Sequence, residues 1–281
     1  MARTNDKPDT IFTAFGIHLM LIVISISCLF PLIWMISSSF KTQNTVFSDL
    51  SLIPSEWHFQ NYIDAWNDGN FQVYLINTFF YTLVVIFFLV LFASMAAYAF
   101  SRLEFPGKNF LFYMFIGVMM IPIPGAFVAI FVVLNKMGLI NTRLGYILPQ
   151  INAGLPFAIY MLKTFFDKMP KELEDSARID GCTKWQIYWH IALPLAKSAI
   201  GVIVIFQALT VWNEFLLAKL ILSDSDLMPL QVGLLKFQGE RITEYPKLMA
   251  GMTISMLPII VIYVFMQKYI IKGITAGAVK G

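Results

Sequence analysis

Long runs of apolar residues dominate the chain and are separated by short polar segments. A helix needs about 20 mostly apolar residues to cross the hydrocarbon core of a membrane. Six runs approach or exceed that length, at 12–38, 74–100, 110–134, 144–166, 198–222 and 248–271. The pattern therefore predicts an all-α integral membrane protein with about six transmembrane helices.

The basic residues predict how these helices are oriented. If both ends of the chain share one side of the membrane, 13 of the 20 lysines and arginines fall on that side and 7 on the other. Cytoplasmic loops keep an excess of basic residues, so the side with 13 is predicted to be cytoplasmic. Segments 1–11 and 273–281 then form cytoplasmic termini, 12–272 forms the transmembrane domain, and the acidic segment 41–71 lies outside.

Composition excludes several classes of protein. Apolar residues make up 58% of the chain and charged residues 13%, against about 25% charged residues in an ordinary soluble domain. The basic residues are scattered, so no stripe suited to nucleic acid is present. Cys28 and Cys182 lie in different kinds of segment and support neither a disulfide nor a metal cluster.

The first apolar run could instead be a cleaved secretory signal, because Arg3 and Lys7 precede it. It is longer than a signal core, lacks an obvious small-x-small cleavage site and contains Pro31 and Trp34. We expect it to be retained as a span.

Prolines and glycines interrupt several predicted spans. Broken or kinked helices are tolerated at membrane depth only where protein or a wet cavity satisfies the freed carbonyls. The interruptions thus point to a solute pathway, although packing kinks explain any single proline equally well. The residues concerned are Pro122, Pro124, Gly125, Pro149, Gly154, Pro156 and Pro258.

The longest predicted cytoplasmic loop, 167–197, encodes two short helices. Pro170 suits the first position of one helix, and Glu172, Glu174 and Asp175 follow near the positive end of its dipole. Gly181 is the expected stop.

The second helix of this loop is predicted to begin with a capping box formed by Thr183 and Gln186. Pro194 is placed to open the fifth span. One helical face is expected to carry Trp185, Tyr188, Trp189 and Ala192. An amphipathic helix lying on the membrane is the alternative, but it would not explain the glycine corner or the spacing to Leu193-Pro194.

The spacing in this loop resembles the EAA loop of permeases of ATP-binding-cassette importers. That pattern is Glu-Ala-Ala, three residues, Gly, nine residues, Ile-x-Leu-Pro. The chain has Asp175-Ser176-Ala177, Gly181 and Ile191-x-Leu193-Pro194 at the same spacing, with Asp for Glu and Ser for Ala.

Three further stretches resemble the second permease subunit of maltose-type carbohydrate importers. They are Asn77-Thr78 through Ser101-Arg102-Leu103-x-Phe105-x-Gly107-Lys108, the tetrad Trp212-Asn213-Glu214-Phe215, and the tail Gly273-Ile274-x-x-Gly277-Ala278-Val279-Lys280-Gly281.

The resemblance implies the type I importer permease fold, in a prokaryotic cell membrane. The chain would form half of the pore of a binding-protein-dependent importer for a carbohydrate. Its expected partners are a second homologous permease, two ATPase subunits and an extracytoplasmic solute-binding protein, which the outer loop 223–247 would meet. ATPase coupling would fall to Glu174, Asp175, Ser176, Ala177, Asp180, Gly181, Leu193 and Pro194.

No Gly-x-x-x-x-Gly-Lys-[Ser/Thr] phosphate-binding loop occurs in the sequence. ATP and magnesium are therefore expected on the ATPase subunits. The chain itself is predicted to be no enzyme and to hold no cofactor or metal.

Glu214 is the one acid well inside a predicted span, where charges are costly and often functional. With Trp212 and Asn213 it could meet a sugar ring in the substrate pathway. The alternative, given more weight, is that Glu214 pairs with Lys219 or a backbone group and fixes helix packing.

Other functions remain open at this point. An ion-coupled secondary transporter would show inverted repeats or paired acids at the midplane, and neither is evident. A permease for a polyol phosphate would want an arginine near the pore, and none is clearly placed there. A membrane-embedded enzyme ranks last, because the spans lack a metal set or a Ser-His pair.

Overall fold

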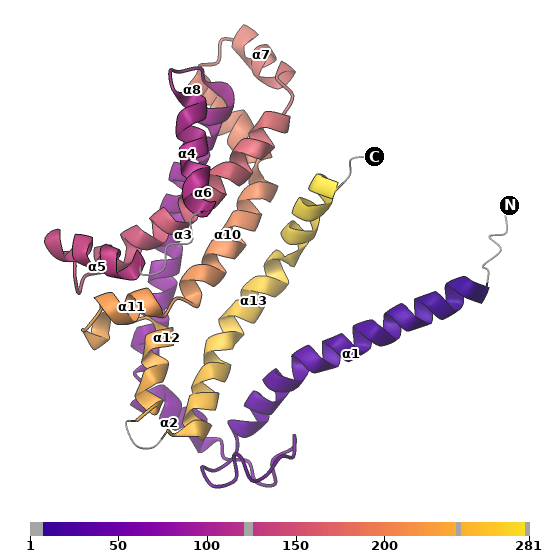
Figure 1. Cartoon of the computed structure of the whole chain (residues 1–281), viewed down its shortest axis with the longest axis vertical. Helices are drawn as coiled ribbons and strands as arrows, with labels where there is room; N and C mark the ends of the chain where they lie inside the picture. The colour runs from indigo at the N-terminus through magenta and orange to yellow at the C-terminus, as the bar shows by residue number, and fades with distance from the viewer. Residues whose placement is uncertain (1–7, 121–125, 240–242, 279–281) are drawn as a thin grey trace. The chain divides into compact units, whose positions relative to one another are not determined.

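The computed structural model describes residues 8–120, 126–239 and 243–278 (Figure 1). Within these ranges the regular structure is helical, apart from one isolated bridge between Gln238 and Thr243. The predicted all-α class is confirmed. The chain divides into two compact units, 1–69 with 236–254 and 70–235 with 255–281, and helix α13 (Tyr245–Ala278) passes from one to the other.

The first unit contains α1 (Pro8–Ser38) and α2 (Gln60–Asp68). From Thr13 to Ser38, α1 is long and apolar enough to cross a membrane. No residue of its most apolar stretch is buried against other described residues. The segment after it folds around Lys41, whose ammonium group donates to the carbonyls of Asp49 and Ser51. A buried lysine thus organises the connection to α2.

The second unit is built on three helices that pack along one another (Figure 1). These are α3 (Phe71–Arg102), α6 (Arg143–Lys168) and α10 (Lys197–Trp212). Small residues at the contact allow the helix backbones to approach closely. Buried alanines on these three helices include Ala93, Ala97, Ala158 and Ala199.

Polar side chains of α3 hold a separate segment of shorter helices in place. That segment contains η2 (Ser225–Leu227), α12 (Leu230–Gly233) and η3 (Leu234–Phe237). Asn77 donates to the carbonyls of Asp226 and Met228, and Thr78 Oγ1 accepts from the amide of Leu230. The Asn77-Thr78 pair therefore satisfies backbone groups that would otherwise be left unpaired within the protein.

Helices occupy the six predicted apolar runs, and two runs are divided between two helices. The run 110–134 holds α4 (Lys108–Met120) and α5 (Ala126–Lys136), while Pro122, Pro124 and Gly125 lie outside the described residues. The run 198–222 holds α10 and α11 (Leu216–Ile221). The predicted single helix for 198–222 is wrong, because the chain leaves the helix between Trp212 and Leu216.

Prolines do not interrupt the other runs as the sequence predicted. Helix α6 continues through Pro149 and Pro156, and α13 continues through Pro258 to Ala278, beyond the expected span end at 271. Among the described residues, three helices are long and apolar enough to cross a membrane, namely Thr13–Ser38, Phe71–Arg102 and Tyr245–Phe265. The bent pair Lys184–Leu195 with Lys197–Trp212 could count as a fourth. The number of six crossings stays a prediction.

The start of α6 depends on a glycine. Thr142 caps the helix by accepting from the amide of Gly145 at 3.1 Å, and the same hydroxyl donates to the carbonyl of Leu139 at 2.7 Å. This brings the Leu139 carbonyl so close that a Cβ at position 145 would lie 2.1 Å from its oxygen.

We expect Gly145→Ala to lower stability by about 1–3 kcal/mol, since the clash is with backbone that a rotamer change cannot relieve. Gly16→Ala is the matched control, because a Cβ at Gly16 meets nothing within 4 Å. Thermal unfolding of the purified protein followed by size-exclusion would show the difference. Equal unfolding temperatures for Gly145→Ala and Gly16→Ala would contradict the predicted clash at position 145.

Candidate functional site

The predicted loop 167–197 begins with helix α7 (Glu172–Ile179). Acidic side chains fill its first turn, where they stabilise the positive end of the helix dipole. Pro170 lies two residues before the helix instead of at its first position, which corrects the prediction. The helix ends as predicted at Gly181, whose φ of +81° is favoured by glycine, with Cys182 donating to the Ala177 carbonyl at 2.9 Å.

A second helical segment follows α7. The predicted capping box is confirmed, since Thr183 and Gln186 bond reciprocally at the start of α8 (Lys184–Ile187). The chain then widens into a π-helical turn, η1 (Tyr188–Ala192), before α9 (Leu193–Leu195). Pro194 belongs to α9, and α10 begins only at Lys197 after a bend of 71°. The prediction that Pro194 opens the long helix is therefore wrong.

The predicted single face of this segment is also divided. Tyr188 and Ala192 are buried, whereas Trp185 and Trp189 remain exposed. A π-helical turn adds a residue to the helical repeat and rotates the following positions, so the spacing of a regular α-helix does not hold across it. Tyr188 contacts the body of the protein through Ser94, with 2.7 Å between the two hydroxyl oxygens.

The predicted coupling residues separate into two faces of α7. Glu174 and Ala177 are buried, and Asp175, Ser176, Asp180 and Gly181 are exposed. In the later part of the loop, Leu193 is half-buried and Pro194 exposed. One face of α7 is thus attached to the protein, while the other is free to meet a partner.

A buried ion pair attaches α7 to the end of α3. Arg102 Nε lies 2.7 Å from Glu174 Oε1, and the two side chains are only 5% and 4% exposed. Arg102 also donates from Nη2 to the Met169 carbonyl at 2.7 Å. Arg178, on α7 itself, lies 3.8 Å from the second Glu174 oxygen. Arg102 was part of a family-like stretch in the sequence, but nothing local to it predicted this partner.

The residue before Arg102 fixes the end of α6. Ser101 donates to one oxygen of Asp167 at 2.6 Å, and Lys163 donates to the other at 2.7 Å. Burial acts to raise the pKa of Asp167, but these bonds outweigh it and the pKa lies below its usual value. The Asp167 carboxylate therefore stabilises this corner at neutral pH, and the contribution is lost as the pH falls through the lowered pKa.

The residues predicted for the substrate pathway have structural contacts. Trp212 is 1% exposed, and its indole donates to the Ser255 carbonyl at 3.1 Å. Glu214 accepts from the amides of Leu217 at 2.6 Å and Ala218 at 3.0 Å, so it satisfies the free amides at the start of α11. Of the three, only Asn213 has an exposed side chain. Glu214 thus has the backbone role that the sequence analysis weighed for it. Among the described residues it forms no ion pair with Lys219.

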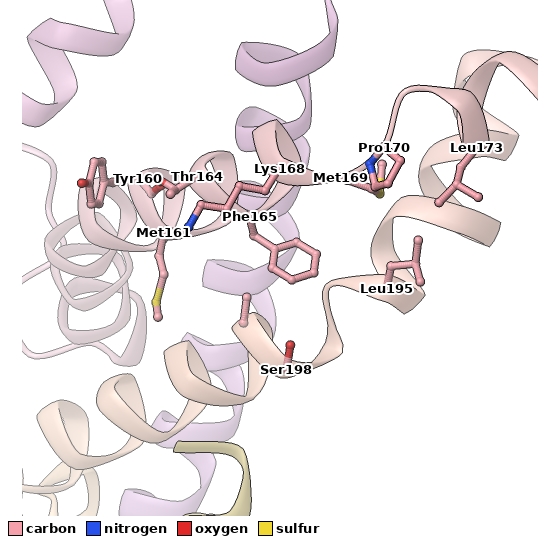
Figure 2. Close-up of a pocket in the computed structure, with 11 residues that line it drawn as sticks. Tyr160, Met161, Thr164, Phe165, Lys168, Met169, Pro170, Leu173, Leu195 and Ser198 are labelled. Carbon is pink, nitrogen blue, oxygen red and sulfur yellow. The ribbon is translucent and has the colours of Figure 1, made fainter. Parts of the chain in front are cut away.

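A cavity of about 500 Å³ lies beside the α7 loop (Figure 2). Figure 2 shows its lining residues gathered from the end of α6, the start of α7 and the segment that opens α10. The wall is mainly apolar and carries a few polar side chains. The polar members are Tyr160, Thr164, Lys168 and Ser198.

A second cavity, of about 370 Å³, lies further along the same two helices. Two aromatic rings flank it, Phe157 on α6 and Phe206 on α10, with centroids 5.9 Å apart. Gln207 and Thr210 add polar groups, and Gln207 approaches α6 closely because Gly154 has no side chain.

The two cavities follow one face of each helix. On α6 their lining residues recur every three or four positions, as do those on α10, which is the spacing of a single helical face. We call this surface the α6–α10 groove. Its residues are Ala153, Phe157, Tyr160, Thr164 and Lys168 on α6, and Ala199, Ile203, Phe206 and Thr210 on α10.

Long apolar helices and a helical fold place the described part of the chain among α-helical membrane proteins. Residues 89–276 match the family described as binding-protein-dependent transport system inner membrane component, and the chain belongs to it. It is a multi-pass protein of the bacterial inner membrane and a permease subunit of a binding-protein-dependent importer.

Individual relatives align over almost the whole chain. The probable ABC transporter permease protein YurM of Bacillus subtilis is 35% identical, covering 96% of this chain and 89% of its own length. The diacetylchitobiose uptake system permease protein NgcG of Streptomyces coelicolor is 30% identical, covering 99% of this chain and 92% of its own. The trehalose transport system permease protein SugB of Mycobacterium tuberculosis is 36% identical, covering 90% and 93%.

The fold is also similar to a solved structure. A chain of a bacterial ABC transporter involved in the import of the acidic polysaccharide alginate superposes with a TM-score of 0.82 at 25% identity, covering 95% of this chain and 99% of that one. The predicted importer permease fold is confirmed.

Removing either partner of the buried ion pair should loosen α7. Arg102→Ala leaves the buried Glu174 carboxylate with only the half-exposed Arg178 at 3.8 Å, and losing the buried partner of such a pair costs about 3–5 kcal/mol. We expect import to fall to background, while the double substitution Arg102→Leu with Glu174→Leu recovers part of the stability. Arg178→Ala, which removes an exposed partner of Glu174, is the matched control and should have a small effect.

Thermal unfolding and uptake measured on the same membranes would decide this prediction. Arg102→Ala behaving like Arg178→Ala in both assays would contradict the proposed role of the pair.

Proposed function

We propose that this chain forms one half of the pore of a carbohydrate importer and that α7 transmits the movement of ATPase subunits to it. The observation that carries the proposal is the division of α7 into an attached face and a free face. Glu174 and Ala177 are buried against the protein, whereas Ile179, at 87% exposed, and Asp180 point away from it. An apolar side chain so exposed at the end of a fixed helix suits insertion into a cleft of a partner.

The partners follow from this role. Two ATPase subunits bind ATP and magnesium, a second homologous permease completes the pore, and an extracytoplasmic binding protein delivers the solute. With α7 and the termini on the cytoplasmic side, closure of the ATPase subunits shifts the equilibrium between inward-open and outward-open states through contacts that differ between them.

Carbohydrate is the proposed substrate class because sugar compounds are named for several relatives, among them diacetylchitobiose for NgcG and trehalose for SugB. The α6–α10 groove supports the same assignment. Aromatic faces beside hydrogen-bonding groups suit a sugar ring, whose C–H faces are apolar and whose edges carry hydroxyls. Phe157, Phe206, Gln207 and Thr210 provide this combination.

An ion-coupled mechanism has less support. It would rest on Glu214, and both carboxylate oxygens of Glu214 accept backbone amides of α11. A group committed to a helix terminus is a poor carrier of a transported ion or proton.

The proposal is tested first by purifying the chain from its native host in mild detergent. We expect a second permease and an ATPase to accompany it, with ATP hydrolysis stimulated by one binding protein and its sugar. In that complex Gly181→Val should abolish import, because a β-branched residue at φ +81° is strained by about 1–3 kcal/mol.

Gly138→Val is the matched control for strain. Gly138 also has a positive φ, of +67°, and also has open space around it, but it lies after α5 and away from the α7 loop. A lone chain without ATPase, or import equal in the two variants, would overturn the proposed coupling.

The groove generates a separate prediction about substrate. Phe206→Ala removes an exposed aromatic face worth on the order of 1 kcal/mol in a contact, so the sugar concentration needed for half-maximal uptake should rise about fivefold. Uptake of labelled sugar measures this. Phe127→Ala, at an exposed phenylalanine of α5, is the control, and equal effects would remove the groove from the pathway.

A further inference from the structure

Helix α2 presents an apolar stripe that stays largely exposed among the described residues of its own compact unit. Phe59, Ile63 and Trp66 follow one another at i, i+4 and i+7, which is one helical face. They are 61%, 52% and 38% exposed. The neighbouring stripe is polar, with Gln60 donating to Asp64 at 2.7 Å. The helix is therefore amphipathic, with its apolar face turned outward.

The face beside this stripe attaches α2 to the residues that directly follow α1. Asn61 donates to the carbonyls of Ser39 and Lys41 at 2.8 and 2.9 Å. The hydroxyl oxygens of Tyr62 and Ser39 lie 2.7 Å apart, and Ala65 is fully buried. The helix cannot turn its apolar stripe inward without losing these contacts.

These contacts also fix the depth of the stripe. Phe40, two residues beyond the end of α1, packs against Phe59 with ring centroids 5.2 Å apart and against Trp57 at 4.9 Å. Helix α1 is exposed along its apolar length, which in a membrane-spanning helix is covered by lipid or partner. The stripe thus continues the apolar surface of α1 at the level where that helix ends.

The side chains of the stripe suit the boundary between membrane and water, where α1 ends. Tryptophan and other aromatic rings are enriched where membrane meets water, because their faces are apolar and their edges tolerate headgroups. Two further apolar side chains of the same connection, Leu50 and Ile53, are 74% and 75% exposed. We propose that α2 lies in the membrane–water interface, with the stripe of Phe59, Ile63 and Trp66 in contact with phospholipid.

Charge indicates which part of the lipid is recognised. Residues 42–69 contain no lysine or arginine, and the acids Asp49, Glu56, Asp64 and Asp68 lie among them. Attraction to anionic headgroups is therefore absent, and the contact depends on buried apolar area. The depth of α2 in the interface should be the same in zwitterionic and in anionic membranes.

Spin labels test the proposal in the full complex reconstituted into lipid nanodiscs. With Cys28 and Cys182 replaced by serine, Ile63→Cys places a label on the stripe and Asp64→Cys places the matched control on the neighbouring polar stripe of Gln60 and Asp64. We expect the label at 63 to be relaxed strongly by oxygen, which partitions into lipid, and weakly by a water-soluble nickel chelate. The label at 64 should show the reverse preference.

Each other result would overturn the proposal. Relaxation of both labels by the nickel chelate would place the stripe in water. Protection of the label at 63 from both reagents would mean that a protein partner covers the stripe. A change in the relaxation of this label on adding the binding protein would mean the same. Trp66→Cys repeats the measurement on the same stripe if the Ile63→Cys complex does not assemble.

Discussion

The buried ion pair between Arg102 and Glu174 is the constraint on which the α7 loop depends. Two charges removed from water are costly unless each finds its partner at hydrogen-bond distance. Their 2.7 Å contact meets that condition only when α7 lies against the end of α3 in one position. The bond from Arg102 to the Met169 carbonyl fixes the turn before α7 as well. One arginine thus sets both the place of the helix and the path of the chain that leads to it.

This attachment matters because α6 lies beside α7 and also lines the α6–α10 groove. Its outer surface forms one wall of the α6–α10 groove, and its last turn is held at Asp167 by Ser101 and Lys163. A force applied to α7 therefore reaches α3 through the Arg102–Glu174 ion pair, and Arg102 also bonds the Met169 carbonyl that directly follows α6. Rigid connection of this kind is what a domain movement needs if it is to open or close a distant pathway.

Local signals in the sequence predicted local structure well. The capping box at Thr183 and Gln186, the stop at Gly181 and the apolar runs each depend on residues within a few positions of one another. The ion pair joins residues 72 positions apart, 102 and 174, and no spacing rule connects them. The π-helical turn at 188–192 was missed for a related reason, since the buried contact of Tyr188 with Ser94 is tertiary and overrides the regular repeat.

Glu214 shows how an error about one level of structure carries into the next. The sequence placed it inside a continuous helix, where a carboxylate has no free amide to bind, and so a role in the pathway had to be considered. The chain instead leaves the helix after Trp212 and begins α11 at Leu216, which exposes unpaired amides at a new helix start. Glu214 accepts two of them, so the break in the apolar run and the acid within it have the same explanation. An acid in an apolar run is then as much a sign of a helix boundary as of a transported ligand.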